Sequence, residues 1–290
     1  MSGVENKVIS YFEGTRWDYR HLWRSDKTGA LHFGYYDWRT RGHVASLRRM
    51  TSYLASLVGV EAGDYVMDAG CGLGGCAIWL AQNRGCRVTG VNITPFQVVA
   101  AREAIQRAGL RGAADVIEAD VVDTGLPART FDVVWALESV VHVDDKAAFL
   151  AEAHRVLKPG GRLMIAEYLL RDVPDLNEAE RADLQIWTDG WVMPRLLSDA
   201  EYGQLLEAQR FDEVKIIDIS RNVVPSLRRL GHLVRLLGPT APMFERLGIL
   251  SAVPAASLRA SAAQIRAFDT SAWSYKVVLA RKASPPSADG

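Results

Sequence analysis

A run of glycines behind a single acid, Asp68-Ala-Gly-Cys-Gly-Leu-Gly-Gly75, has the composition of a turn that binds a ligand. The short apolar run at 65–67 predicts a buried strand before this turn, and residues 76–81 predict a helix after it. Glycine lets the backbone turn tightly and lets a ligand approach the N–H groups at a helix N-terminus. The pattern alone does not identify the ligand, because nicotinamide- and flavin-binding folds use a glycine-rich turn too.

An acid or an amide stands at the end of four of the expected strands: Asp68, Asn92, Asp120 and Glu138. Because ligands of open α/β sheets bind at the carboxyl ends of the strands, we expect these side chains at one edge. A dinucleotide site would need an acid at position 92 for the ribose and has no evident use for Asp68. S-adenosylmethionine fits better, since its ammonium and sulfonium groups favour carboxylates and its adenine amine needs an acceptor such as Asp120.

Strands and helices alternate along most of the chain, and this order predicts a parallel, doubly wound α/β sheet. Seven strands are expected, at 65–67, 87–92, 115–119, 131–137, 162–166, 213–218 and 273–280. Three helices between the strands are predicted to start at capping residues, at positions 94, 144 or 145, and 198. The second of these helices is expected to end at 157. The sheet is therefore expected to be seven-stranded and mostly parallel.

The remaining segments are expected to cover this sheet. The first 40 residues are rich in aromatic side chains, which suits a cover over a binding site. The expected division is an N-terminal helical cover at 1–60, a ligand-binding core at 61–170, an inserted helical lid at 171–197, the C-terminal part of the sheet at 198–282 with a helical cap at 222–270, and a disordered tail at 283–290.

The overall composition is that of a globular protein without a charged partner. The 290 residues include 34 basic and 34 acidic side chains, which predicts no electrostatic footprint for nucleic acid or an anionic membrane. No apolar run reaches the ~18 residues that could span a bilayer, and the N-terminus lacks the layout of a signal peptide. Cys71, Cys76 and Cys86 have neither zinc-ligand spacing nor the pattern of a disulfide framework. We expect a cytoplasmic protein with reduced thiols, as a monomer or a homo-oligomer.

Four segments resemble, in order and spacing, the motifs of class I S-adenosylmethionine-dependent methyltransferases. They are Asp68-Ala-Gly-Cys-Gly-Leu-Gly74, Ala119-Asp120, Phe131-Asp-Val-Val-Trp135 and Arg155-Val-Leu-Lys-Pro-Gly-Gly161. The resemblance implies a Rossmann-like methyltransferase fold with S-adenosylmethionine as its cofactor. The residues it implies for cofactor binding are Asp68, Gly70, Cys71, Gly72 and Gly74 around the methionine end, Asn92, Ile93 and Gln97 at the ribose and adenine edge, Asp120 and Val121 at the adenine, and Leu137 behind the methionine amine.

The second strand and the cover segments resemble one branch of this family. The family usually has an acid at position 92, whereas Gly90-Val-Asn-Ile-Thr-Pro-Phe-Gln97 is closer to tocopherol and bacterial isoprenoid C-methyltransferases and cyclopropane-fatty-acid synthases. In that branch a glutamine at position 97 can serve the ribose. The same branch is similar in its N-terminal cover and near 187–191 and 222–226. The resemblance implies the following residues for the cover and the substrate: Tyr11, Tyr19, His32, Tyr35, Tyr36, Trp187 and Trp191.

Two kinds of acceptor atom require different bases. A hydroxyl or amine acceptor needs one base, and His142 is the better candidate because its free pKa lies near neutrality. A carbon acceptor becomes a carbocation, which needs aromatic faces to stabilise it and a carboxylate, Glu138 or Glu167, to take the proton. Because the chain has eight Trp and nine Tyr, we predict carbon methylation of an isoprenoid or another apolar natural product. The alternative is O- or N-methylation of an aromatic or sugar-bearing metabolite.

A prenyl diphosphate is one acceptor that the sequence leaves open. Arg16, Arg20, Arg39 and Arg41 could meet its phosphates, with Mg²⁺ required only in that case. Two further classes remain: a nicotinamide-dependent oxidoreductase, which would share the glycine turn, and a catalytically silent protein that binds S-adenosylmethionine. Binding of the methyl donor followed by a transfer assay separates them.

Overall fold

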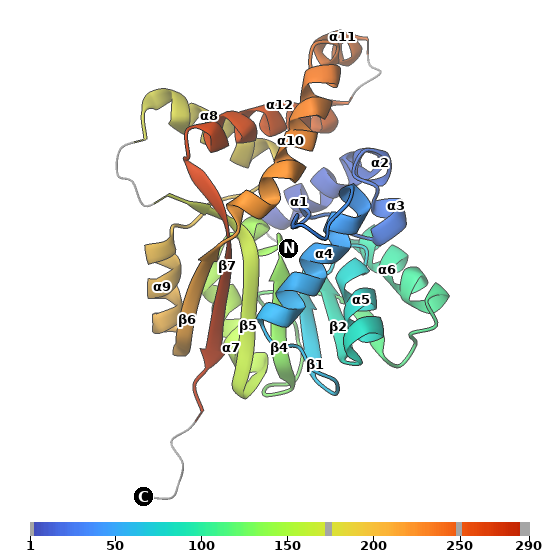
Figure 1. Ribbon diagram of the computed structural model, residues 1–290, viewed down its shortest axis with the longest axis vertical. Helices are drawn as coiled ribbons and strands as arrows, with labels where there is room; N and C mark the ends of the chain where they lie inside the picture. Colours follow the sequence, from blue (N-terminus) through green and yellow to red (C-terminus); the bar gives the residue numbers. More distant parts are fainter. Residues whose placement is uncertain (1–2, 172–175, 248–250, 285–290) are drawn as a thin grey trace, which may run out of the picture.

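The computed structural model describes residues 3–171, 176–247 and 251–284. Within them, seven strands form one sheet in the order β3-β2-β1-β4-β5-β7-β6 (Figure 1). Neighbours from β3 to β5 pair in parallel, whereas β7 is antiparallel to both β5 and β6. The strands are β1 Tyr65–Ala69, β2 Arg87–Asn92, β3 Ala114–Glu118, β4 Phe131–Leu137, β5 Leu157–Leu170, β6 Phe211–Asp218 and β7 Trp273–Lys282. The predicted seven-stranded, mostly parallel sheet is confirmed.

The longest strand, β5, starts earlier than the sequence pattern predicts. It begins at Leu157, directly after a helix, instead of at position 162. Its register against β4 moves from Phe131–Leu157 to Val133–Arg162, so the residues between form a bulge in the strand and not a separate turn. Gly160, with a φ of 73°, supplies the left-handed backbone that this bulge requires.

Helices cover both faces of the sheet (Figure 1). The helices that follow or precede strands are α4 His43–Leu57, α5 Gly75–Arg84, α6 Pro95–Arg107, α7 Lys146–Val156 and α9 Asp199–Ala208, with the 3-10 turn η1 at Val140–His142. Asp145, and not Asp144, caps α7 by accepting a hydrogen bond from the N–H of Ala148. Ser198 and Glu201 form a capping box at α9, which confirms the predicted start of that helix.

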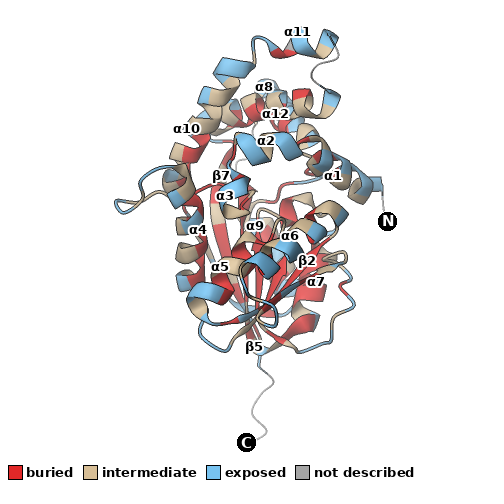
Figure 2. Ribbon diagram, turned by 90° about the vertical axis from the view of Figure 1, so that its right-hand side faces the viewer, coloured by how far each residue is buried: buried red, intermediate tan, exposed pale blue. Residues whose placement is uncertain are grey.

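Apolar side chains bury both faces of the sheet, as the red strands in Figure 2 show. Neighbouring residues of a strand point to opposite faces, so Val66 packs on the side of α4, α5 and α6, whereas Met67 packs on the side of α7 and α9. The same alternation recurs in β4, where Trp135 faces the first side and Val134 the second. This two-sided core holds the carboxyl ends of the strands in fixed positions.

Helices from three separate parts of the chain gather over one end of the sheet (Figure 1). They are α1 Gly3–Gly14, α2 Arg16–His21, α3 Ser25–Thr28, α8 Glu178–Gly190, α10 Ser220–Leu237, α11 Ala241–Arg246 and α12 Ala252–Asp269. Glycines let two of them approach α12 closely. A Cβ added at Gly14 would lie 2.7 Å from the Val253 side chain, and one at Gly190 would lie 2.6 Å from Cβ of Ala260. We call this group of helices the cover.

Parts of the predicted segments lie outside the described residues: 1–2 of the N-terminal cover, 172–175 of the lid, 248–250 of the cap and 285–290 of the tail. Among the helices that are described, none is long and apolar enough to cross a membrane. Cys71, Cys76 and Cys86 are free and buried.

Candidate active site

The glycine turn after β1 forms a cradle beside a buried acid. Asp68 is 2% exposed, its Oδ2 has no hydrogen-bond partner among the described residues, and burial raises its pKa to about 7. Gly70 and Gly72 have φ values of 75° and 53°, in the left-handed region that favours glycine. A Cβ at Gly70 would lie 2.3 Å from Cβ of Ser139. Only glycine therefore keeps this turn, and the buried acceptor beside it suits a cationic ligand group.

The amide at the end of β2 organises the neighbouring edge. Asn92 Nδ2 donates to the carbonyl oxygen of Gly72 at 3.2 Å and to Oε1 of Gln97 at 2.8 Å. Its Oδ1 accepts from the N–H of Thr94 at 3.2 Å. A carboxylate could not make the two donated bonds, which gives a physical reason for the amide at this position. Asn92 thus fixes the glycine turn and orients Gln97.

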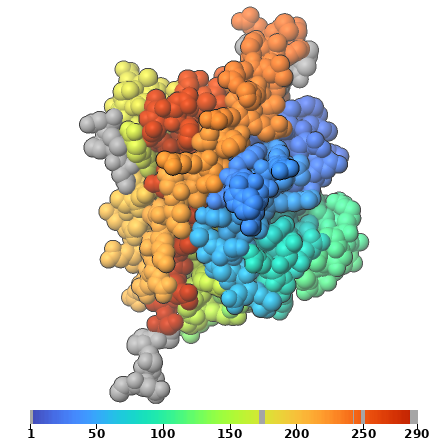
Figure 3. Space-filling view, viewed as in Figure 1, coloured from blue at the N-terminus to red at the C-terminus, as the bar shows by residue number. Residues whose placement is uncertain are grey.

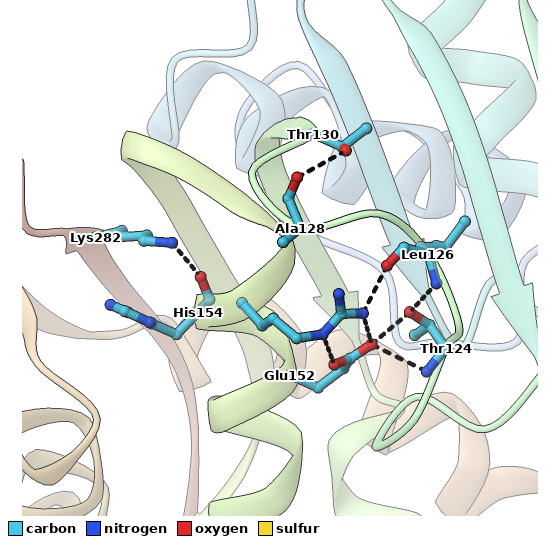
Figure 4. A network of polar contacts seen from close by, with 8 residues as sticks. Thr124, Leu126, Ala128, Thr130, Glu152, His154 and Lys282 are labelled. Carbon is cyan, nitrogen blue, oxygen red and sulfur yellow. Dashed lines mark hydrogen bonds and ion pairs between the residues drawn. The ribbon is translucent and has the colours of Figure 1, made fainter.

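Asp120 lies two residues beyond the end of β3, in the loop that leads to β4. Its Oδ1 accepts a hydrogen bond from the N–H of Val122 at 3.1 Å. Burial, together with the negative charges of Glu5 and Asp123, raises its pKa despite this hydrogen bond. Hydrogen bonds to α7 hold this loop in place: the Glu152 carboxylate accepts from the N–H and from Oγ1 of Thr124, at 3.0 and 2.5 Å (Figure 4).

Arg155, from the last motif of the resemblance, completes this fastening. Its guanidinium donates to Glu152 at 2.6 and 2.7 Å and to the carbonyl oxygen of Leu126 at 2.7 Å. Burial raises the pKa of Glu152, but the hydrogen bonds from Arg155 and Thr124 outweigh it and the pKa is lowered. Arg155 therefore has a positioning role: with Glu152 it holds the loop that carries Asp120.

One cavity of about 940 Å³ joins the cradle to the cover. Among the predicted cofactor residues, all line this cavity except Gly74. Gly74 instead precedes α5 as its N-cap with a φ of 80°, where an added Cβ would lie 3.1 Å from Cβ of Ala101. Its conformation shapes the turn without reaching the cavity.

Glu138 lies at the end of β4, where the cradle meets the rest of the cavity. Its Oε1 accepts from the N–H of Phe33 and from Oη of Tyr275, each at 2.7 Å, and its Oε2 accepts from Oη of Tyr168. Burial raises its pKa to about 7, reinforced by the charge of Glu167 and opposed by the three hydrogen bonds. A carboxyl that titrates near neutrality and borders a cavity can accept a proton there.

Two neutral histidines line the cavity as well. Nδ1 of His142 lies 3.0 Å from the carbonyl oxygen of Val192, and Nδ1 of His32 lies 2.8 Å from that of Phe33. Because a carbonyl only accepts, Nδ1 carries the proton in both rings and Nε2 has a free lone pair. Burial lowers the pKa of each to about 4. Both are therefore neutral acceptors at neutral pH.

Glu167 does not line the cavity, so the prediction that it takes a proton from the acceptor does not fit its position. It lies on β5 with its side chain on the face of α9, where Oη of Tyr202 donates to its Oε1. The charge of Lys146 partly offsets the effect of burial, which raises the pKa of Glu167 to about 7. The alternation of β5 explains the correction, because the next residue, Tyr168, faces the cavity.

The predicted cover residues divide into two groups. Tyr11, Tyr19, His32 and Trp191 line the cavity, with Oη of Tyr11 and Oη of Tyr19 3.3 Å apart.

Three cover predictions are corrected. Tyr35 stacks on Tyr53 with ring centroids 4.1 Å apart, outside the cavity. Tyr36 is joined to Asn222 through its backbone. Trp187 is fully buried, with its ring 5.0 Å from that of Trp273. Tyr35 thus packs on α4, Tyr36 is bonded to α10 and Trp187 packs on β7, and none of the three lines the cavity.

Sequence reasoning missed two sets of residues at the site: the two tyrosines that bind Glu138, of which Tyr168 lines the cavity and Tyr275 does not, and an apolar wall. Tyr168 and Tyr275, which bind Glu138, come from adjacent strands whose pairing the sequence does not reveal. The other set forms an apolar wall from the C-terminal cover: Leu230, Leu233, Val234, Leu237, Phe244, Pro254 and Leu258. The helical spacing of the apolar residues in α10 was the available signal for this wall.

The charges that line the cavity have one sign. The acids are Glu5, Asp18, Asp68, Asp120, Glu138, Asp144 and Asp145, and among the described lining residues none is lysine or arginine. Arg16 lies over the ring of Phe96 at 5.0 Å and Arg39 over that of Trp38 at 4.4 Å, while Arg20 and Arg41 are exposed. The four arginines proposed for phosphates thus lie off the cavity. In the described part of the chain, no group of three or more metal-ligating side chains occurs.

The sheet order with its antiparallel β7, the cradle and the acids at the strand ends define a class I S-adenosylmethionine-dependent methyltransferase. The Methyltransferase domain family matches residues 67–165. The 27-O-demethylrifamycin SV methyltransferase of Amycolatopsis mediterranei is 31% identical, over 87% of this chain and 89% of that protein. The S-adenosyl-L-methionine-dependent Diels-Alderase iccD of Talaromyces variabilis is 34% identical over 88% of each chain.

A solved structure shows the same fold over the whole chain. The geranyl diphosphate C-methyltransferase of Streptomyces coelicolor A3(2) superposes with a TM-score of 0.75 at 17% identity, over 97% of this chain and 98% of that one. The chain therefore belongs to the S-adenosylmethionine-dependent methyltransferase family, as its motifs predicted.

Proposed function

We propose that this enzyme transfers a methyl group from S-adenosylmethionine to an uncharged, apolar small molecule, at a carbon atom. One observation carries the proposal: a single cavity joins the cradle at Asp68 to a chamber with aromatic and aliphatic walls, and Glu138 lies at the junction. The names of the similar methyltransferases, which refer to rifamycin and to geranyl diphosphate, support an acceptor of the natural-product type.

The charges of the cavity narrow the class of acceptor. A diphosphate brought among acids, without a lysine or arginine in the wall, would lose its hydration and gain repulsion. An uncharged acceptor avoids both costs, and a cationic intermediate is favoured by the same acids. We therefore infer an acceptor without a phosphate group, and the charges of the cavity disfavour the prenyl diphosphate that the sequence leaves open.

The residues present fit the methyl donor. When bound, S-adenosylmethionine supplies a methyl group already activated by its sulfonium. Asp68, whose Oδ2 has no partner among the described residues, and the N–H groups of the glycine turn would hold its methionine end. Asp120 would accept from the adenine amine, and Gln97, oriented by Asn92, would serve the ribose edge.

Glu138 would complete the transfer to carbon. The π electrons of the acceptor form the new bond to the methyl carbon, the pair of the broken C–S bond stays on sulfur, and a carbocation remains on the acceptor. The Glu138 carboxylate stabilises this cation and takes the proton that restores the double bond. The hydrogen bonds from Tyr168, Tyr275 and Phe33 hold the carboxylate in place, and the apolar walls of the chamber disfavour the water that would otherwise capture the cation.

A panel of paired acceptors tests the proposal. Each pair shares an apolar skeleton and differs only in its head group, as geraniol and geranyl diphosphate do, and each is incubated with methyl-labelled donor. We expect label in neutral acceptors, attached to carbon when the product is examined by NMR. Label confined to the diphosphates would overturn the inferred acceptor class, and label on oxygen or nitrogen would assign the reaction to the alternative that uses neutral His142 as base.

A second candidate function follows from one relative. The Diels-Alderase that is 34% identical to this chain carries S-adenosyl-L-methionine dependence in its name. The cavity of this chain could likewise fold a flexible polyene for cyclisation. The mass of the product distinguishes the two functions, because methylation adds a CH₂ and consumes the donor, whereas cyclisation changes neither the mass nor the donor concentration.

A further inference from the structure

Exposed apolar side chains concentrate at one end of the cover. Half of the large apolar side chains exposed in the described chain fall within residues 236–247: Leu236, Leu237, Met243, Phe244 and Leu247. The others, Trp17, Trp38, Val99, Ile186 and Val214, are scattered. We call residues 228–247 the α10–α11 tip, and it projects from the far end of the cover (Figure 3). Clusters of this kind in an otherwise ordinary surface mark interaction sites.

Basic side chains accompany these apolar residues. Within the tip, residues 228–247 contain four arginines and a single acid, Glu245, although the net charge of the chain is zero. Glu245 is paired with Arg259 at 3.1 Å. Arg228, Arg235 and Arg246 are exposed and form no ion pair with any described residue. The tip is therefore a locally cationic surface with apolar side chains between the charges.

The tip is also part of the cavity wall. Leu233, Val234, Thr240 and Ala241 line the cavity. Leu237 and Phe244 line it too, yet they are 37% and 36% exposed. The apolar surface outside thus continues into the apolar chamber inside through these two side chains.

We propose that the α10–α11 tip docks on an anionic lipid bilayer and admits lipophilic acceptors from it into the cavity. Apolar side chains flanked by arginines suit the boundary between acyl chains and anionic head groups. A second copy of this chain suits the surface less well, because a symmetric contact would bring the arginines of one tip against those of the other. The delivery of an acceptor rests on the proposed function, whereas docking does not.

Sedimentation with vesicles tests the docking. We expect the full chain to sediment with phosphatidylcholine vesicles that contain phosphatidylglycerol, and to bind pure phosphatidylcholine vesicles less. Each of Arg235→Gln and Arg246→Gln should weaken binding to the anionic vesicles by about five-fold. Leu236→Ser combined with Leu247→Ser should weaken binding to both kinds. Val99→Ser combined with Val214→Ser is the matched control, because it removes exposed apolar side chains elsewhere and should leave binding unchanged.

Three outcomes would overturn the proposal: no binding to anionic vesicles, equal losses in the tip variant and its control, or self-association through the tip in sedimentation-velocity runs without lipid. Methyl transfer is measured in parallel with an acceptor dissolved in solution and with the same acceptor embedded in vesicles. The tip variants should slow only the second reaction. Failure of transfer in both would count against the proposed function and leave the vesicle-binding result standing.

Discussion

Glu138 is the carboxylate whose surroundings the fold specifies most closely. It directly follows β4 and has a φ of 50°, an uncommon conformation for a residue other than glycine. Three hydrogen bonds from β5, β7 and the segment before α4 fix its two oxygens. A strained residue held by several partners beside a cavity is a frequent feature of functional sites. Its identity was predicted from the strand end, but its partners were not.

Replacing Glu138 with glutamine should lower the rate of methyl transfer by a factor of about 10²–10⁴, the usual contribution of a positioned base. Glutamine keeps the shape but takes no proton, so donor affinity should change little. Single-turnover rates and calorimetric titration with S-adenosylhomocysteine measure the two effects. Glu167→Gln is the matched control, because burial raises the pKa of Glu167 to about 7 as well, but Glu167 lies off the cavity. Equal rate losses in the two variants would contradict the assigned role.

The pKa of Glu138, raised to about 7 by burial, sets the direction of two pH dependences. Only the ionised carboxylate takes a proton, so the transfer rate should rise as the pH increases through about 7. Stability should change in the opposite sense: the contribution of this group is complete below its ordinary pKa of 4.5 and is lost as the pH rises through about 7. Rate profiles and urea unfolding across this window test both, and Glu138→Gln should abolish the rise in rate.

Asp120→Ala should weaken binding of S-adenosylhomocysteine by about 1.5–3 kcal/mol, the range for a hydrogen bond to a charged group. The expectation follows from the position of Asp120 on the cavity wall at the edge assigned to adenine. Calorimetric titration measures the change. Asp123→Ala, an exposed acid in the same loop, should leave the affinity unaltered. An unaltered affinity in the Asp120 variant would remove the adenine assignment.

At the scale of elements, one carboxylate of α7 fastens the loop between β3 and β4 (Figure 4). Glu152→Ala would leave the N–H of Thr124 without its buried acceptor, at a cost of about 1–3 kcal/mol in the free energy of unfolding. Donor affinity should also fall, since this loop carries Asp120. Urea unfolding and donor titration measure these changes. Glu103→Ala, which removes an exposed ion pair with Arg107, should cost at most about 0.5 kcal/mol.

The positions of the helices and strands were largely predictable from the sequence. Which face of each strand meets the cavity was not. Glycines and caps in the sequence indicated where strands end and helices begin, which was enough to place Asp68 and Glu138 at one edge. The choice between Glu167 and Tyr168 depended on which face of β5 meets the cavity, and strand order decides that. The sequence does not show that β7 inserts beside β5, so the pairing of Tyr168 with Tyr275 was beyond its reach.

At the scale of the whole molecule, the cover and the sheet share one cavity. A ligand that binds only the folded chain should raise the free energy of unfolding by about 2.7 kcal/mol when its concentration is 100 times its Kd. If the cover belongs to the donor site, S-adenosylhomocysteine should also slow amide hydrogen exchange in α1 and α2, whose residues line the cavity beside the cradle. Mass spectrometry of exchanged peptides checks this. Slowing limited to β1, β2 and the loop after β3 would place the cover outside the donor site.

Bulk properties were the least informative part of the sequence at this scale. A net charge of zero predicted no footprint for an anionic surface, yet five arginines lie within residues 220–247 with one acid. A sum over the chain hides such segregation, and only the folded cover shows which of these side chains are exposed together. The cover draws on three distant parts of the chain, so its contacts follow from long-range packing that local patterns do not specify.

The hydrogen bond from Phe33 to Glu138 has a consequence for timing. Phe33 comes from the N-terminal part of the chain and Glu138 from the sheet, so lifting that segment would remove a donor and let solvent reach the carboxyl. Its acidity would then return toward that of an ordinary glutamate. The carboxylate would be a weaker base while reactants enter, and its basicity would rise only once the segment encloses it.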